Sequence, residues 1–249
     1  MPSVPDFAGI REEIDLTLFV PCLNEETRIV PTLETVRAAM AELGCSYEVI
    51  VVDDGSTDRT AAVVQDFAAR NPDMPVMLHS NPRNQGLSCS FVDTAFRGRG
   101  RYYRLVCGDN VEPKESMLKI LGRMGKADIV IPYYPELPGK SRSRKVISRT
   151  YTIVVDLLSG NKLHYYNGCA LYRRAHVMRW ASYNYGFGFQ AHLITTLLDR
   201  KATYVEVPIA GFHLTKDRGS PLNLRNFLST THTLIEILVR RIRTMVYGN

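Results

Sequence analysis

A short apolar run that ends in two carboxylates and a glycine constrains the fold of this chain more than any other feature. Residues 49–58 read VIVVDDGSTD. The four β-branched residues predict a strand buried on both faces, and Gly55 permits a tight turn after it. Ser56, Thr57 or Asp58 can then cap a following helix. A buried strand that turns at once into a helix is typical of a parallel sheet covered by helices.

The same alternation of apolar runs and helical stretches extends along the chain. Strands are predicted at residues 16–20, 49–52, 76–78, 102–106 and 129–131. Helices are predicted at residues 27–43, 58–70, 87–97 and 114–124. Helices at 146–158 and 189–200 and strands at 170–173 and 203–207 would complete the sheet. The expected fold class is therefore α/β, with a mixed, mostly parallel central sheet flanked by helices.

Composition and charge narrow the class of protein. The chain of 249 residues has a formal net charge of +6, which favours polyanionic partners such as phosphates, anionic lipid or nucleic acid. Aromatic residues do not interleave with basic ones as they do in stacking platforms, so we expect no nucleic acid partner. Five scattered cysteines lack zinc spacing, which predicts reduced thiols. The chain start does not read as a signal peptide and no apolar stretch is long enough for a membrane span, so a cytoplasmic location is expected.

A second motif ends the first predicted strand. Residues 19–26 read FVPCLNEE, so this strand ends in a P-x-x-N-E sequence. The chain thereby resembles the family 2 glycosyltransferases, whose first strand ends in P-x-x-N-E and whose second ends in V-D-D-G-S-x-D. The resemblance implies the Rossmann-like glycosyltransferase-A fold. It also implies transfer of a sugar, with inversion, from a nucleoside-diphosphate sugar to an acceptor.

The resemblance assigns both strand ends to the donor nucleotide. By this resemblance Pro21, Asn24, Glu25, Asp53 and Asp54 would line the nucleotide pocket, with Asp53 nearest the base or the ribose. Carboxylates at that place can accept hydrogen bonds from a nucleobase N–H or from ribose hydroxyls. Asn24 and Glu25 have an alternative interpretation as a capping pair for the helix that follows them.

The turn after the fourth predicted strand, CGDN at residues 107–110, is expected to hold a divalent cation. A nucleotide-sugar transferase needs Mg²⁺ or Mn²⁺ because the cation neutralises charge that builds on the diphosphate leaving group. The family places a D-x-D sequence in this turn. Here Cys107 replaces the first aspartate, so Asp109 is the predicted metal ligand, with Gly108 beside it in the donor site. Asp109 as a helix cap before Pro113 is the alternative.

A further segment of the predicted donor site is NPRNQGLSCSF, at residues 81–91. It is similar to the family segment in which a basic residue and a glycine precede a helix that faces the nucleotide. Arg83 and Gly86 are therefore added to the predicted donor site. An arginine in this turn can contact the base or the pyrophosphate, and a solvated surface charge is the alternative.

The second half is most similar to the dolichyl and polyprenyl phosphate sugar transferase group of this family. The matching segments are ISRTYT at 147–152, NGCALYRR at 167–174, GFGFQAHLI at 186–194, YVEVPI at 204–209 and HLTKDRGSPL at 213–222. His192 stands where the group usually carries a glutamate. The resemblance implies a polyprenyl (lipid) phosphate as the acceptor.

The charge pattern of the second half favours the same acceptor. A lipid phosphate is already anionic at neutral pH, so it needs cationic binding rather than a general base. The predicted acceptor-binding residues are Arg144, Lys145, Arg149, Gln190, His213, Lys216 and Arg218. The predicted catalytic residues are Asp109, His192 and Arg218. The alternatives are a hydroxyl acceptor, for which His192 would act as the base, and a relative that binds nucleotide without catalysis. A packed or surface histidine is the alternative interpretation of His192.

The two ends of the chain lie outside the matching segments. We expect an N-terminal extension at residues 1–14, a catalytic domain at 15–221 and a C-terminal amphipathic helix at 222–249. Apolar residues recur with helical spacing in the last segment, with Arg225, Arg240, Arg241 and Arg243 beside them. Such a helix can lie on an anionic membrane as a peripheral contact, or it can pack on the sheet or on a second subunit.

Overall fold

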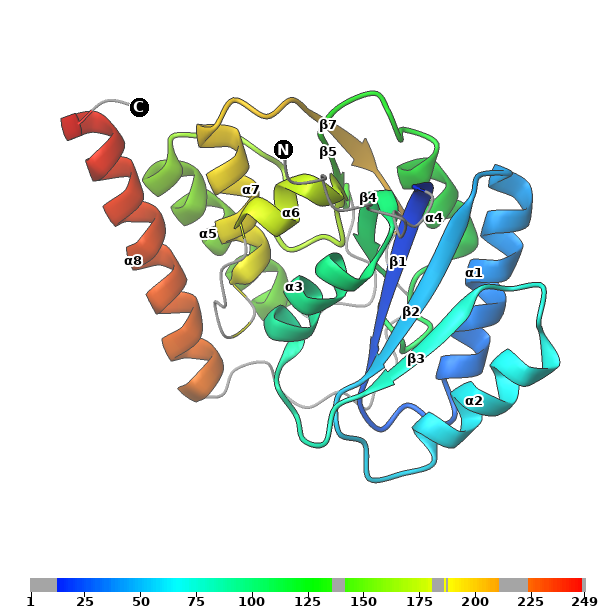
Figure 1. Cartoon of the computed structure of the whole chain (residues 1–249). Coiled ribbons are helices and arrows are strands. Elements are labelled where there is room, and N and C mark those ends of the chain that lie inside the picture. The colour runs from blue at the N-terminus through cyan, green and yellow to red at the C-terminus, as the bar shows by residue number, and fades with distance from the viewer. Residues whose placement is uncertain (1–12, 136–141, 181–185, 187, 211–223, 248–249) are drawn as a thin grey trace, which may run out of the picture.

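The structure is a computed structural model, and it describes residues 13–135, 142–180, 186, 188–210 and 224–247. These residues build one central β-sheet with helices on both faces (Figure 1). The strands are β1 (Ile14–Cys22), β2 (Tyr47–Asp53), β3 (Val76–Ser80), β4 (Gly100–Leu105), β5 (Ile129–Tyr133), β6 (Leu171–Arg173) and β7 (Tyr204–Pro208).

The strand order within this described sheet is β3-β2-β1-β4-β6-β5-β7. β1 pairs in parallel with β2 and β4, β2 pairs in parallel with β3, and β5 pairs in parallel with β7. β6 runs antiparallel to both of its neighbours, β4 and β5. The sheet is therefore mixed and mostly parallel, which confirms the predicted fold class.

Helices cover the two faces of the sheet and enclose two hydrophobic cores. One core packs against α1 (Ile29–Leu43), α2 (Thr60–Arg70) and α4 (Lys114–Leu121). The other packs against α3 (Leu87–Arg97), α5 (Arg142–Ser159), α6 (Arg174–Trp180), α7 (Phe189–Asp199) and α8 (Leu224–Tyr247). α8 lies at the edge of the molecule, on the side opposite α1 and α2 (Figure 1).

The apolar runs of the central strands explain why both faces are covered. Successive side chains of a strand point to opposite faces of its sheet. Val49 and Val51 of β2 accordingly enter the core beneath α1 and α2, whereas Ile50 and Val52 enter the core beneath α3 and α7. A strand that is buried on both faces needs the continuous apolar pattern from which it was predicted.

One helix of the structure was not predicted from the sequence. The helix α6 was not expected, because its seven residues are too few to show helical periodicity.

The predicted C-terminal helix is present as α8 and packs on α5 and α7. The proposed domain boundaries stay predictions, since residues 1–12 and 211–223 lie outside the described ranges. Among the described residues, no helix has both the length and the apolar content required to cross a bilayer.

Candidate active site

The turns after β1 and β2 lie side by side and are joined by hydrogen bonds. Cys22 at the end of β1 is in register with Asp53 at the end of β2. Asn24 has a φ of 56°, and its Oδ1 accepts a hydrogen bond of 2.9 Å from the backbone N of Thr57. Its own backbone N donates to Ser56 Oγ at 2.9 Å. The two sequence motifs therefore fold into a single double turn.

The next pair of acidic residues extends this double turn. The backbone N of Glu26 donates to Asp58 Oδ2 at 3.2 Å, and Glu26 Oε2 accepts from the backbone N of Arg59 at 3.0 Å. Glu25 donates its backbone N to Thr60 Oγ1 at 2.8 Å and pairs its carboxylate with Arg28 Nε at 2.6 Å. The capping alternative for Asn24 and Glu25 is wrong, because α1 begins after Arg28 without a side-chain cap.

Asp53 stands at the carboxyl end of β2, where the sheet meets this double turn. Its carboxylate is buried, and Oδ1 accepts a hydrogen bond of 3.0 Å from the backbone N of Ser56. This contact fixes the direction of the side chain and leaves Oδ2 outside the turn's own hydrogen bond. Contact of Asp53 with a base or a ribose stays a prediction.

Asp54 organises the segment that connects β3 to α3. Its Oδ1 accepts hydrogen bonds from Asn81 Nδ2 at 2.8 Å and from the backbone N of Gln85 at 2.9 Å. Its Oδ2 accepts from the backbone N of Gly86 at 2.9 Å. Both oxygens of this buried carboxylate thus hold the segment that carries Arg83. This positioning task could not be read from the sequence, and direct contact with a nucleotide stays a prediction.

Two glycines shape the same segment. Gly86 has a φ of 91° and stands immediately before α3. Gly55 has a φ of 82°, and a Cβ on it would lie 2.8 Å from the backbone N of Asn84 and 2.9 Å from the carbonyl carbon of Arg83. Glycine at position 55 therefore lets the segment cross the double turn. Arg83 is exposed at this crossing.

The turn that carries Asp109 is fixed against β1 and α1. The backbone N of Gly108 donates to Pro21 O at 3.2 Å, and a Cβ on Gly108 would lie only 2.6 Å from that oxygen. Asn110 has a φ of 54° and donates its backbone N to Thr32 Oγ1 at 2.9 Å. Asp109 is buried between these anchors. The helix-cap alternative for Asp109 is wrong, because α4 begins after Pro113 without a side-chain cap.

A buried ion pair connects the residues before and after the same turn. Arg104 Nη2 lies 2.6 Å from Glu112 Oε1, and both side chains are buried. Arg104 Nε also donates to the backbone oxygen of Cys169 at 3.1 Å. Burial alone would lower the pKa of Arg104, but the adjacent Glu112 carboxylate, together with contributions from Cys169 and Tyr134, raises it. Sequence reasoning missed this pair, although an arginine inside a predicted strand was a visible signal.

The residues around Asp109 fit a cation that arrives with the nucleotide. Cys107 Sγ lies 3.9 Å from Cys169 Sγ, so a thiol pair stands where the family has its first aspartate. Among the described residues, no group of three or more His, Cys, Asp or Glu side chains is arranged to hold a metal. Mg²⁺ takes one or two protein carboxylates and completes its shell with substrate phosphates and water. Asp109 as the protein carboxylate of such a site stays a prediction.

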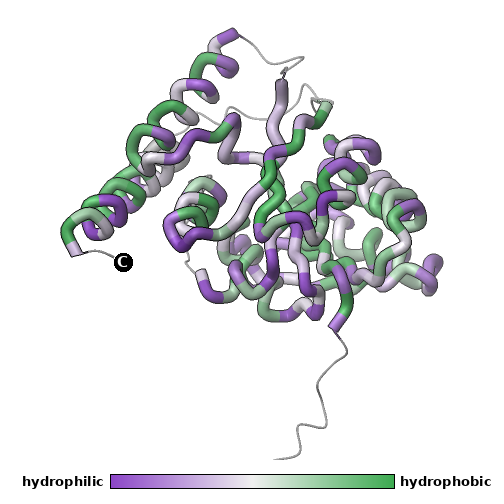
Figure 2. The backbone as a smooth tube through the Cα atoms, turned by 90° about the horizontal axis from the view of Figure 1, so that it is seen from above, coloured by the Kyte–Doolittle hydropathy of each residue, from purple (hydrophilic) through white to green (hydrophobic). Residues whose placement is uncertain are grey.

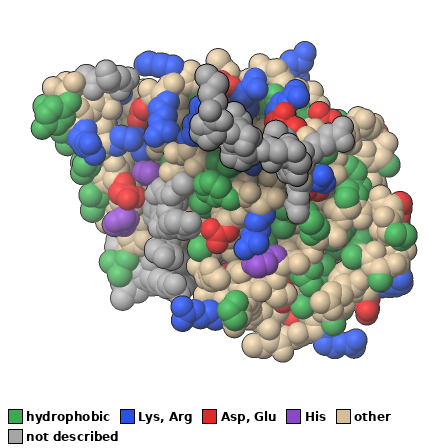
Figure 3. Space-filling model, in the orientation of Figure 1, with side chains coloured by type: hydrophobic (Ala, Val, Ile, Leu, Met, Phe, Trp, Pro, Cys, Tyr) green, Lys and Arg blue, Asp and Glu red, His purple; other side chains and the backbone are tan. Residues whose placement is uncertain are grey.

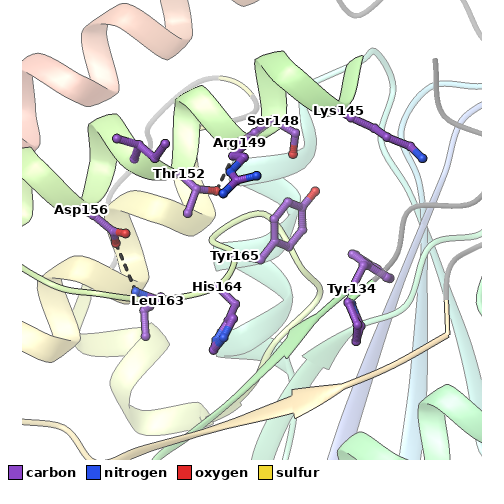
Figure 4. Close-up of a pocket in the computed structure, with 11 residues that line it drawn as sticks. Tyr134, Lys145, Ser148, Arg149, Thr152, Asp156, Leu163, His164 and Tyr165 are labelled. Atoms are coloured by element: carbon purple, nitrogen blue, oxygen red, sulfur yellow. Dashed lines mark hydrogen bonds between the residues drawn. The ribbon is translucent and has the colours of Figure 1, made fainter. Parts of the chain in front are cut away.

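A pocket of about 660 Å³ opens beside α5, at the edge of the sheet where β5 ends. Lys145, Arg149 and Ile153 of α5 line it, and Arg149 and Thr152 point toward Tyr165 across the pocket (Figure 4). Cationic and apolar side chains thus share one wall. Of the acceptor residues predicted on this helix, Arg144 is exposed and does not line the pocket.

Hydrogen bonds to Asp156 of α5 hold the opposite wall of the pocket, at residues 163–166. Asp156 Oδ1 accepts from the backbone N of Leu163 at 3.2 Å and from the hydroxyl of Tyr166 at 2.7 Å. His164 Nδ1 lies 2.9 Å from Glu206 Oε2, and the His164 ring stacks on Tyr133 with centroids 4.3 Å apart. Lys145 and Arg149 line the pocket together with one carboxylate, that of Asp156, so its described lining has more cationic than anionic side chains.

The contacts of His192 disfavour its predicted role as a general base. His192 Nδ1 accepts a hydrogen bond of 3.0 Å from the indole N–H of Trp180. Burial, with a contribution from the nearby charge of Arg240, lowers the pKa of His192 to about 4. The neutral ring therefore carries its proton on Nε2 and uses its lone pair for Trp180. His192 joins α6 to α7, and Arg240 of α8 binds Asp199 of α7 at 2.7 Å beside it.

The remaining predicted residues are placed as follows. Gln190 stands in the first turn of α7, where its Oε1 is enclosed without a hydrogen-bond partner among the described residues. His213, Lys216 and Arg218 lie outside the described residues. The predicted donor residues from β1, β2, β4 and the β3–α3 segment are therefore brought together, and two of the predicted acceptor cations meet in the pocket beside β5.

Known proteins share this sequence pattern and this architecture. The chain matches the family model described as glycosyl transferase family 2 over residues 17–180, so the chain belongs to glycosyl transferase family 2. Two solved structures share the fold. Glucosyl-3-phosphoglycerate synthase from Mycobacterium tuberculosis, in complex with UDP, has a TM-score of 0.66 at 19% identity, over 91% of this chain and 80% of that one. The mannosyltransferase from Pyrobaculum calidifontis, in complex with GDP-Man and Mn²⁺, has a TM-score of 0.66 at 15% identity, over 96% and 72%. This likeness confirms the predicted glycosyltransferase-A fold.

Curated relatives are similar in sequence. A dolichyl-phosphate beta-glucosyltransferase of Trichomonas vaginalis is 28% identical over 79% of this chain and 64% of its own length. A dodecaprenyl-phosphate galacturonate synthase of Rhizobium johnstonii is 32% identical over 64% of this chain and 47% of its own length. The chain thus spans about half to two thirds of the length of these relatives. Their group is the one that the second half of the sequence predicted.

Proposed function

We propose that this chain is an inverting glycosyltransferase that moves a sugar from a nucleoside-diphosphate sugar to a polyprenyl phosphate. The pocket beside α5 is the observation that carries the proposal, because it combines the cations Lys145 and Arg149 with the apolar side chain of Ile153. A phosphate on a hydrocarbon chain needs both kinds of contact. The relatives named for dolichyl and dodecaprenyl phosphate support the same class of acceptor.

The donor is proposed to bind where β1, β2 and β4 end. Asp53 would accept hydrogen bonds from the base or the ribose, and Arg83, held above Gly55, would contact the base or the pyrophosphate. Asp109 would bind Mg²⁺ or Mn²⁺, whose charge stabilises the diphosphate leaving group. The solved relatives in complex with UDP and with GDP-Man and Mn²⁺ support a nucleotide sugar and a divalent cation.

The acceptor phosphate is proposed to act without a general base. Its anionic oxygen would attack the anomeric carbon from the face opposite the diphosphate, the new C–O bond would form, and the bond to the leaving diphosphate would break. Lys145 and Arg149 would hold this phosphate by charge-assisted hydrogen bonds. The reaction then requires no base at position 192, which agrees with the contact between His192 and Trp180.

A cytoplasmic location with peripheral contact to a membrane is part of the proposal. The acceptor of such a transferase is anchored in a bilayer by its hydrocarbon chain. The enzyme must therefore reach the headgroup region, and the amphipathic helix α8 is the element that we assign to this contact.

Transfer assays test the proposal directly. UDP-, GDP- and dTDP-sugars are offered with a short, water-soluble prenyl phosphate or with sugar hydroxyl acceptors, and the product is detected by mass spectrometry. We expect transfer to the prenyl phosphate and loss of turnover in Asp109→Ala. Transfer only to hydroxyl acceptors would overturn the lipid phosphate, and no binding of any nucleoside diphosphate would overturn the whole proposal.

The pocket is tested by two variants on α5. Lys145→Ala and Arg149→Ala should each raise the KM for the prenyl phosphate about tenfold or more, because each removes a charge-assisted hydrogen bond. Donor affinity, measured by calorimetry, should stay unchanged. Arg142→Ala is the matched control, since Arg142 is an exposed cation of the same helix that does not line the pocket. An unchanged KM in both pocket variants would remove the pocket from the acceptor site.

A further inference from the structure

The helix α8 is apolar on the side where a surface helix is normally polar. One side of it enters the core, with Ile237 fully buried. On the other side Ile235, Val239, Ile242 and Val246 are exposed at intervals of three and four residues, so they form one stripe along the helix. Hydrophobic residues recur along α8 to its C-terminal end (Figure 2). An amphipathic helix packed only on its own domain would carry polar residues there.

The helix α5 has the same property. Val155 is fully buried in the core, whereas Val146, Ile153 and Leu157 are exposed, Leu157 by 78%. Their spacing of seven and four residues places them on one face of the helix. This face borders the pocket, because Ile153 and Arg149 line the pocket from the same helix.

The two exposed stripes belong to neighbouring helices. α5 packs against α8, and the guanidinium group of Arg241 lies against Gly160, directly after the end of α5. Together the stripes form what we call the α5–α8 face, defined by Val146, Ile153, Leu157, Ile235, Val239, Ile242 and Val246. Exposed apolar side chains that gather on two neighbouring helices indicate an interaction site.

Basic side chains border the α5–α8 face. Each of the two helices carries four Lys or Arg residues and one acidic residue. Arg142 and Arg149 are exposed on α5, and Arg243 is exposed on α8. Basic side chains lie next to the hydrophobic ones over the C-terminal end of α8 (Figure 3). Apolar residues with a cationic border fit a leaflet that contains anionic lipid.

We propose that the α5–α8 face docks on an anionic membrane leaflet and thereby opens the α5 pocket toward the lipid. The α5 helix would take part in both docking and acceptor binding, with one side facing the bilayer and the adjacent side lining the acceptor pocket. A polyprenyl chain could then remain in the membrane while its phosphate enters between Lys145 and Arg149. The second step rests on the proposed transfer to a polyprenyl phosphate, whereas the docking itself does not.

A second copy of the chain fits this face less well than a membrane. A two-fold symmetric contact would place the same surface on both partners. The cationic borders of α5 and α8 would then meet like charges, which is unfavourable at an interface. The membrane supplies the opposite charge along the whole border.

Vesicle co-sedimentation without nucleotide or acceptor tests the docking. Leu157→Glu and Val239→Glu each place a carboxylate in one of the two stripes, and each should weaken binding to vesicles that contain phosphatidylglycerol about tenfold. Arg243→Glu should weaken binding to the same vesicles roughly fivefold or more, with little effect on vesicles of phosphatidylcholine alone. Met77→Glu is the matched control, because Met77 is 42% exposed on β3, which is the edge strand at the other end of the sheet from β7.

Two readouts distinguish membrane docking from misfolding and from dimerisation. The three face variants should keep wild-type circular dichroism and transfer to the short, water-soluble prenyl phosphate, while losing transfer to long-chain polyprenyl phosphate in vesicles. Wild-type vesicle binding by Leu157→Glu and Val239→Glu would overturn the proposal. It would also be overturned by a dimer of the wild-type chain, seen in sedimentation velocity, that the same two substitutions dissociate. Failure of the proposed transfer reaction would remove transfer but leave vesicle binding intact.

Discussion

The guanidinium group of Arg104 and the carboxylate of Glu112 meet at 2.6 Å beneath the turn that carries Asp109. The pair bridges the end of β4 and the residues that precede α4, and Arg104 also binds the backbone oxygen of Cys169. The predicted metal ligand is thus supported by a buried charge pair rather than by the sheet alone. This relationship makes the turn sensitive to substitutions at residues that touch no substrate.

Breaking this pair should destabilise the protein strongly. Arg104→Met leaves Glu112 buried without its cation and is expected to lower the free energy of unfolding by about 3–5 kcal/mol. Urea denaturation measures the change. The double variant Arg104→Met/Glu112→Leu should recover a large part of the loss, because it removes both charges. Lys114→Ala breaks an exposed pair with Glu42 and should cost less than about 1 kcal/mol. Equal losses in Arg104→Met and Lys114→Ala would contradict this account.

Two glycines with left-handed backbones allow a matched comparison. Gly44 has a φ of 66° and no atom within 4 Å of the position that a Cβ would take, whereas a Cβ on Gly55 would meet the backbone of Arg83 and Asn84. Gly44→Ala should therefore cost about 1 kcal/mol of stability, and Gly55→Ala about 2–4 kcal/mol. Calorimetric titration with nucleoside diphosphate should also show weaker donor binding in Gly55→Ala alone. Equal effects of the two substitutions on both measurements would show that the close approach of Arg83 and Asn84 to Gly55 does not cause the difference.

The stability of the protein should depend on pH through His192. The pKa of His192 is lowered to about 4 in the folded protein, below the ordinary histidine value near 6.5. The unfolded chain therefore binds more protons than the folded one between these values, so stability is complete above about pH 6.5 and falls as the pH drops toward 4. The loss should reach up to about 3 kcal/mol at pH 4. The pKa of Asp128, lowered to about 2 mainly by hydrogen bonds from Thr203, affects stability only at lower pH.

The variant His192→Gln separates this effect from catalysis. Glutamine can still accept a hydrogen bond from Trp180 but does not titrate. Urea denaturation between pH 4.5 and pH 7 should then show a flatter slope than in the wild type. Transfer activity at neutral pH should persist. A folded variant with the wild-type slope would contradict the titration of His192 as the cause, and a folded variant that loses transfer would support the general-base interpretation.

Replacing Cys107 should change the affinity for the cation. Cys107→Asp places a second hard ligand at the position where the family has its first aspartate, and we expect about tenfold tighter Mn²⁺ binding in the presence of nucleoside diphosphate. Calorimetry or Mn²⁺ electron paramagnetic resonance measures the affinity. Cys107→Ser is the control, because it removes the thiol without adding a charge. Unchanged affinity in a folded Cys107→Asp would show that position 107 does not face the cation.

The fold was predictable where each residue obeys a local rule. The buried runs of β1 and β2 show a continuous apolar pattern, and the glycine that follows β2 marks its turn, so strands and turns could be found without tertiary information. The meeting of Asp53 and Asp109 at one edge followed from parallel strand order and from the resemblance to the family.

The roles of individual side chains were less accessible. Asp53 and Asp54 are adjacent residues with the same side chain. Asp54 supports residues 81–86 and Asp53 does not, and only the three-dimensional path of that segment shows this difference. The sequence left His192 open between a base and a packed histidine, because its hydrogen-bond donor Trp180 belongs to a helix that shows no periodicity of its own. The α5–α8 face could not be predicted from the sequence, because it depends on which side chains are exposed on two helices that are far apart in the chain.

The antiparallel strand β6 has a consequence for the order in which the chain can fold. β5 pairs with β6 and β7 and has no direct pairing with β4 in the described sheet. During synthesis, β1 to β4 can associate as soon as they leave the ribosome, but β5 must wait for Leu171–Arg173 before it can join them. The part of the sheet that carries Asp53 and Asp109 would thus form first and serve as a template, and β5, β6 and β7 would be added to a framework already in place.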